Sequence, residues 1–151
     1  MATEKESVPV PVKKGFSIGD FNEVKACDTL FRVVLKDADG EPISDGDGGT
    51  LGVYIIGSES KELTEFDKKT TKKVINEVWL KKNKGDKNYD KPDIDDAQEK
   101  RIARLQVMVK KWDLTDPLTT ENIALFFGNN PSFEKQFENA NKDLRNFLPS
   151  L

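Results

Sequence analysis

Histidine is absent from the chain, and Cys27 is its single cysteine. Histidine is the most frequent general base, and zinc sites are built chiefly from cysteine and histidine. One thiol cannot form an intramolecular disulfide, which favours a reducing compartment. We therefore expect no enzyme activity, no cofactor and no catalytic or zinc site, and we expect Cys27 to be a small packing residue.

Long apolar runs and nucleotide-binding glycine motifs are also missing. No stretch approaches the roughly 20 apolar residues that cross a bilayer, and residues 1–14 lack the apolar middle of a signal peptide. Neither GxxxxGK[ST] nor GxGxxG occurs. These absences predict a cytoplasmic protein without a membrane partner.

Charge of one sign does not dominate: 27 acidic residues face 24 basic ones, with a net charge of -3. A nucleic-acid-binding domain usually has a basic face and a high pI. Lysines do gather in residues 68–91, where Trp79 and Tyr89 could stack on bases. Because Asp86 and Asp90 interrupt this cluster, a solvated helix face is the preferred interpretation, and nucleic-acid binding is the less favoured alternative.

Two parts of unequal size make up the chain. Residues 1–14 are polar and carry Pro9 and Pro11 between valines, which predicts a flexible N-terminal tail. Residues 15–151 fit a single domain. Its predicted fold class is α+β, with an N-terminal antiparallel β-hairpin or small sheet (about 30–57) followed by about four α-helices (about 59–148).

The hairpin is predicted from two segments rich in β-branched and aromatic residues, 30–35 and 51–56. Residues 37–49 between them are dense in aspartate and glycine, as in a long turn. An isolated hairpin is marginally stable in water, so this one must pack on the helices or pair with another strand.

The acidic loop of this hairpin partly resembles a calcium-binding loop. Asp37, Asp39 and Glu41 alternate as required, but Pro42 stands where glycine is needed and Gly48 where a bidentate glutamate is needed. A register that starts at residue 45 fails in the same way. A solvated loop is the preferred interpretation, and weak calcium binding is the alternative.

Helix signals follow one another after residue 58. Ser58 or Ser60 caps a first helix to about residue 82, with an apolar stripe of Leu63, Phe66, Val74, Ile75, Val78 and Trp79. Asp93 caps a second, expected to bury Ile94, Ala97, Ile102, Leu105, Met108, Val109 and Trp112. Thr119 caps a third helix through residue 127, and Asn130 and Pro131 open a fourth that continues to residue 148.

Aromatic residues are concentrated near the C-terminus. The preferred interpretation is that they form the core against the first two helices. A chain this polar, with a hairpin in need of a partner, also leaves surfaces suited to binding another protein. The candidate partner-binding residues are Phe126, Phe127, Phe133, Phe137, Phe147 and Tyr54.

The order of these features resembles a kind of tail assembly chaperone from long-tailed bacteriophages. In that kind a hairpin with a Gly-Val-aromatic second strand precedes helices, as in Gly52-Val53-Tyr54 here. A later helix ends in tryptophan and leads into Leu-Thr-x-Glu-Asn, matched by Trp112 and by residues 118–122. An aromatic helix ending in Phe-Leu closes the pattern, matched by residues 133–148, so the resemblance covers roughly residues 30–148.

The resemblance implies a non-catalytic chaperone of the host bacterium's cytoplasm. Its implied partners are the phage tape-measure protein, the major tail tube protein or both, bound transiently during tail assembly, with self-association as a further possibility. The lysine-rich linker around residues 81–93 and the proline-containing tail do not match the pattern. A structural component of the tail or connector is therefore the first alternative function.

Overall fold

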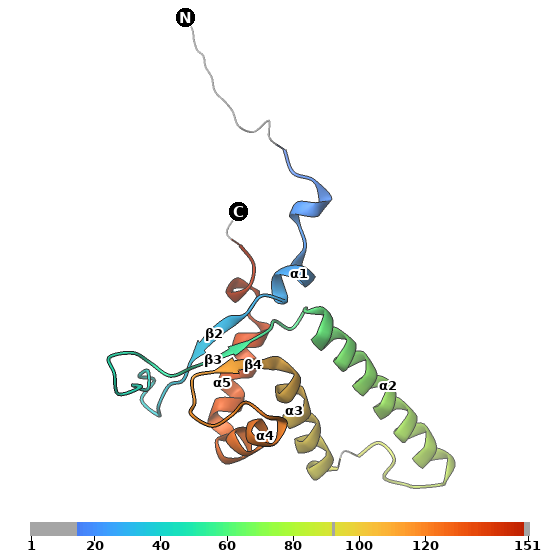
Figure 1. The fold of residues 1–151 in the computed structure, drawn as a ribbon. Helices are drawn as coiled ribbons and strands as arrows, with labels where there is room; N and C mark the ends of the chain where they lie inside the picture. The colour runs from blue at the N-terminus through green and yellow to red at the C-terminus, as the bar shows by residue number, and fades with distance from the viewer. Residues whose placement is uncertain (1–14, 92, 150–151) are drawn as a thin grey trace, which may run out of the picture.

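The computed structural model describes residues 15–91 and 93–149 (Figure 1). The predicted tail, residues 1–14, lies outside the described residues. The described part holds a three-stranded antiparallel sheet and five α-helices, so the predicted α+β class is confirmed. None of the helices in these two ranges combines the length and apolar character that crossing a bilayer requires.

The predicted hairpin forms the first two strands of the sheet. Strand β2 (Phe31–Val34) pairs antiparallel with β3 (Gly52–Ile55), with Val33 opposite Val53. Val33, Val53 and Ile55 are buried because alternate residues of each strand face the helices. The hairpin packs on the helical part of the chain. This packing is expected, because an isolated hairpin is only marginally stable in water.

The sheet has a third strand that sequence reasoning assigned to a helix. Strand β4 (Val109–Trp112) pairs with β3, with Val53 opposite Trp112. The apolar residues up to Trp112 follow helical spacing, so the predicted second helix was too long. Helix α3 instead ends at Met108, and Val109 adopts extended backbone (φ -81°, ψ 125°). Pairing with β3 satisfies backbone groups that a longer helix would leave unpaired at the sheet edge.

The described residues hold five α-helices, and the four that were predicted begin close to their predicted caps. The five are α1 (Glu23–Cys27), α2 (Lys61–Asn83), α3 (Ile94–Met108), α4 (Thr120–Asn129) and α5 (Pro131–Lys142). The side chains of Ser60, Asp93 and Thr119 each accept a backbone N–H of the first turn, as N-caps do.

The ends of the chain differ from the prediction. The last helix stops at Lys142, and a short 3₁₀ turn (Leu144–Asn146) follows in place of further helix. Asp143 interrupts the helix because it adopts extended backbone and its carboxylate accepts the N–H of Arg145. Helix α1 and the 3₁₀ turn Ile18–Asp20 were not predicted; each is too short to show a periodic pattern.

The hydrophobic core lies between the sheet and helices α3, α4 and α5, which gather beside it in Figure 1. Its largest fully buried side chains include Phe127 and Phe137, whose rings meet edge to face with centroids 5.0 Å apart. Cys27 is fully buried, and a Cβ at Gly57 would come within 2.7 Å of its sulfur. Burial raises the pKa of the Cys27 thiol, consistent with its predicted packing role.

Helix α2 stands apart from this core. Every residue of α2 is described, and Leu63 in its first turn is the single one that is buried. Figure 1 shows α2 leaving the end of β3 and running away from the sheet, beside α3, to the loop that joins the two helices. The far half of α2 therefore presents much of its surface to solvent.

Candidate protein-binding surface

Three of the predicted partner-binding aromatics lie in the core. Phe127, Phe137 and Phe147 are buried, so in this conformation their side chains are not available to a partner. Only an edge of Phe147 reaches the surface, where it lines a hollow of about 730 Å³ with Phe21 and Leu148. The prediction that the C-terminal aromatics build the core describes these residues better than a docking role does.

The other aromatic candidates are half-buried. Phe126 stacks on Phe133 at 5.4 Å between centroids and meets Trp112 edge to face at 5.9 Å. Both phenylalanines thus extend the core toward the surface. Tyr54 lies on the opposite face of the sheet, because its neighbours in β3 are buried, and the Nζ of Lys111 is 5.0 Å from its ring centroid. The structure does not bring Tyr54 together with the C-terminal aromatics.

The carboxylates of the acidic loop bind their own backbone. Oδ1 of Asp37 accepts the N–H groups of Asp39 and Glu41. Asp45 Oδ1 accepts those of Asp47 and Gly49, and these bonds lower the pKa of the Asp45 carboxyl. Among residues 15–91 and 93–149, no three His, Cys, Asp or Glu side chains are grouped to hold a metal ion. The loop geometry is that of consecutive Asx turns.

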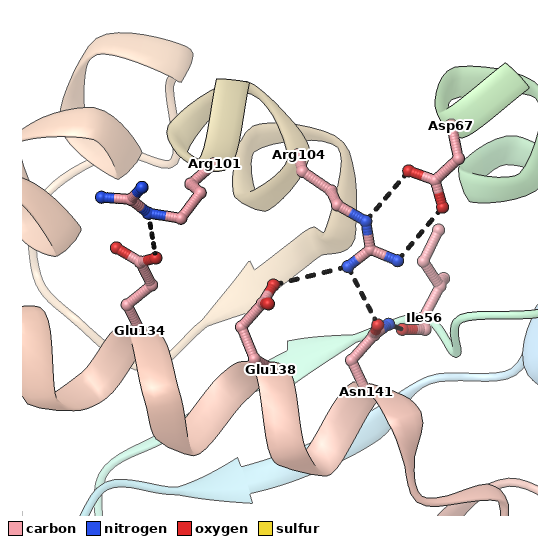
Figure 2. Close-up of polar contacts among 7 residues, drawn as sticks. All are labelled: Ile56, Asp67, Arg101, Arg104, Glu134, Glu138 and Asn141. Atoms are coloured by element: carbon pink, nitrogen blue, oxygen red, sulfur yellow. Dashed lines mark hydrogen bonds and ion pairs between the residues drawn. The ribbon is translucent and has the colours of Figure 1, made fainter. Parts of the chain in front are cut away.

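A polar network joins α2 to the rest of the fold (Figure 2). The Arg104 guanidinium on α3 donates to Asp67 on α2, with Nε–Oδ1 at 3.0 Å and Nη2–Oδ2 at 3.3 Å. Its Nη1 lies 3.1 Å from Asn141 Oδ1 and 3.5 Å from Glu138 Oε1, both on α5. Asn141 is fully buried and donates through Nδ2 to the Ile56 carbonyl at 2.8 Å. Four segments thus meet at one point.

This network ties α2, α3 and α5 to the segment that follows β3. Its carboxylates are paired with arginine, and a second pair, Arg101 Nε with Glu134 Oε2 at 2.9 Å, lies beside it (Figure 2). The network thus fixes the direction in which α2 leaves the domain.

On the C-terminal side of Asp67, α2 carries two large exposed apolar side chains close together. Ile75 is 63% exposed and Trp79 is 60% exposed. The prediction that both belong to one apolar stripe with Leu63, Val74 and Val78 was wrong, because the apolar residues of α2 divide between two faces. Val74 and Val78 line the side next to α3, while Ile75 and Trp79 face away from it.

Lysines continue the line of these two residues in both directions. Lys68, Lys72, Ile75, Trp79 and Lys82 follow one another at intervals of four, three, four and three, so they form one row along α2. We call this row the basic-aromatic stripe. Among the described residues, no ion pair involves Lys68, Lys72 or Lys82. The spacing was readable in the sequence, but which face it lay on was not.

No protein-family model, no curated protein and no solved structure matches this chain.

Proposed function

We propose that this chain is a non-catalytic assembly chaperone. In this proposal it transiently binds the tape-measure protein, the tail tube protein or both while the tail of a long-tailed phage assembles. The observation that carries the protein-binding part is the exposure of Ile75 and Trp79 on a helix that projects from the core. The phage part rests on the sequence resemblance.

The physical reason for a binding role is the cost of leaving large apolar side chains in water. Burying an aromatic side chain removes roughly 150–250 Å² from solvent. A helix face that presents such side chains in one row is a usual docking site for another helix. Covering the apolar segments of a partner until it is assembled would be stoichiometric, so no catalytic residues are required.

The first test is capture of an identified partner. Tagged full-length protein should retain a long tape-measure protein from a lysate of infected cells, identified by mass spectrometry. Trp79→Ala should reduce the amount retained. Ile94→Ala, which removes an 83% exposed apolar side chain from α3 away from the stripe, is the matched control and should leave retention unchanged.

The second test separates the chaperone from a structural component of the tail or connector. A chaperone should be present in the assembling lysate and absent from purified virions. Stoichiometric recovery of the protein from purified virions would reject the chaperone role and favour the structural one.

A further inference from the structure

We infer that the basic-aromatic stripe of α2 binds an amphipathic helix whose apolar residues are flanked by carboxylates at both ends. This inference rests on the proposed function for the existence of a protein partner. It adds the chemistry of that partner and the surface that selects it.

The geometry of the stripe determines the shape of the partner that can pack along it. From Lys68 to Lys82 the row spans about 21 Å at the α-helical rise. Alternating intervals of three and four are those by which one helix packs along another. Ile75 and Trp79 occupy the middle of the row, and lysines occupy its ends. A matching helix therefore has its apolar residues at the centre and its charges toward both ends.

The charge of the region sets the sign of those charges. Residues 68–91 contain nine lysines and three carboxylates, although the whole chain carries a net charge of -3. The stripe is thus a basic patch on an acidic protein. The stripe lysines have no ion-pair partner among the described residues, so their charge is available to an incoming group. Complementary charge speeds encounter and sets partner choice.

The same lysines argue against a second copy of this chain as the occupant. Two α2 helices packed antiparallel along the stripe would bring Lys68 and Lys72 of one copy toward Lys82 of the other. Packed in parallel, each lysine would meet its own equivalent. Like charges at such positions are destabilising.

Nucleic acid fits the stripe less well than a helix does. Proteins that bind single strands stack successive bases on several aromatic side chains. The stripe offers one aromatic, Trp79, and beside it Ile75, which has no ring to stack. Tyr89 is not a second platform on this row, because the Nζ of Lys82 lies over its ring at 5.6 Å. An apolar helix face uses both Ile75 and Trp79.

The inference is tested with full-length protein and three synthetic helical peptides. The peptides share one leucine-rich apolar line and differ in their flanking residues, which are glutamate, glutamine or lysine. Affinities are measured by polarisation of a fluorescent label. The glutamate peptide should bind at least about tenfold more tightly than the lysine peptide, and this difference should shrink as salt is raised.

Amino-acid substitutions in the protein identify the surface that binds the peptide. Trp79→Ala should weaken binding of the glutamate peptide by about 30-fold, the scale of an interface hot spot, while Ile94→Ala leaves it unchanged. The triple variant K68E/K72E/K82E should prefer the lysine peptide. Its control, K36E/K69E/K135E, makes the same change in net charge at exposed positions off the stripe and should still prefer glutamate. Far-UV circular dichroism verifies that each variant is folded.

Several results would overturn the inference. They are equal affinity for all three peptides, binding of none, a preference unaffected by the stripe variants, or a dimer in sedimentation equilibrium that Trp79→Ala dissociates. Retention of a labelled oligo-dT strand that is lost in Trp79→Ala, without peptide binding, would assign the stripe to nucleic acid.

The peptide assay and the capture from lysate fail independently. If the peptides show the expected pattern but no tape-measure or tube protein is captured, the phage role is rejected and the partner chemistry stands. If a tape-measure protein is captured equally well by Trp79→Ala and K68E/K72E/K82E, the chaperone role stands and the stripe is not its binding site.

Discussion

Helices α2 and α5 share a pattern of charged and apolar residues, but they have opposite roles in the structure. Both are rich in charge and carry apolar residues at helical spacing. In α5 the apolar face turns entirely inward, and Phe137 and Asn141 are buried. In α2, with 23 residues, burial is limited to Leu63, and Ile75 and Trp79 face solvent. An apolar stripe therefore predicts a helix, whereas its surroundings decide whether it serves the core or a partner.

The test with the largest expected effect removes one aromatic side chain from each of the two helices. Phe137→Ala should lower the free energy of unfolding by about 3–5 kcal/mol, because it leaves a cavity in the core. Trp79→Ala should change it by no more than about 0.5 kcal/mol, as expected for a surface residue. Urea unfolding followed by circular dichroism measures both. Similar losses in the two variants would mean that Trp79 is packed rather than exposed.

A second test addresses the buried polar residue of α5. Asn141→Ala should cost about 2 kcal/mol, because the buried Ile56 carbonyl loses its side-chain partner and an N–H of Arg104 loses an acceptor. Asn139→Ala, two residues away and exposed, is the control and should be nearly neutral. A cost for Asn139→Ala as large as that for Asn141→Ala would show that the loss is one of helix propensity.

The third test concerns the joint between α2 and the core. Asp67→Ala should cost about 0.5–1 kcal/mol, since the ion pair with Arg104 is only partly shielded from water. Hydrogen exchange should become faster in the later turns of α2 and stay unchanged in α5. Glu65→Ala on the exposed side of α2 is the control. Faster exchange in both helices would show that α2 is not an independent unit.

The smallest expected effect is at the sheet and depends on pH. Asp113 Oδ2 lies 2.6 Å from Arg32 Nη2 and accepts the N–H of Gly52 at 3.0 Å, and these contacts lower the pKa of the Asp113 carboxyl. The stabilisation is therefore present above the unfolded-state pKa of about 4 and is lost as the pH falls through the lower, folded-state pKa.

Because both side chains are about one-third exposed, we expect only a few tenths of a kcal/mol. Asp113→Asn should remove this acid-dependent part of the stability and leave the rest of the pH profile unchanged. Unfolding free energies measured between about pH 2 and 7 report the difference. A profile for Asp113→Asn identical to that of the unmodified protein would show that the pair contributes nothing.

Much of the fold was predictable because its signals are local. The caps at Ser60, Asp93 and Thr119 and the hairpin segments depend on residues close together in the chain. Strand β4 was not predictable in this way. Residues 109–112 have a helical spacing, and only the backbone groups of β3, more than 50 positions earlier in the sequence, give them a reason to extend.

The candidate binding surface also combines features that the sequence predicted with features that only the tertiary structure determined. Composition alone argued against histidine chemistry, disulfides and a Cys/His zinc site. The order of residues in the sequence showed where the lysines and the aromatic residues are concentrated. The tertiary structure decided that Phe127 and Phe137 are core and that Ile75 and Trp79 are surface. The physical reason is that periodicity describes one helix at a time, whereas burial depends on how many faces of that helix other elements cover. Helix α3 lies along one side of α2, so the apolar residues on its other side remain in solvent.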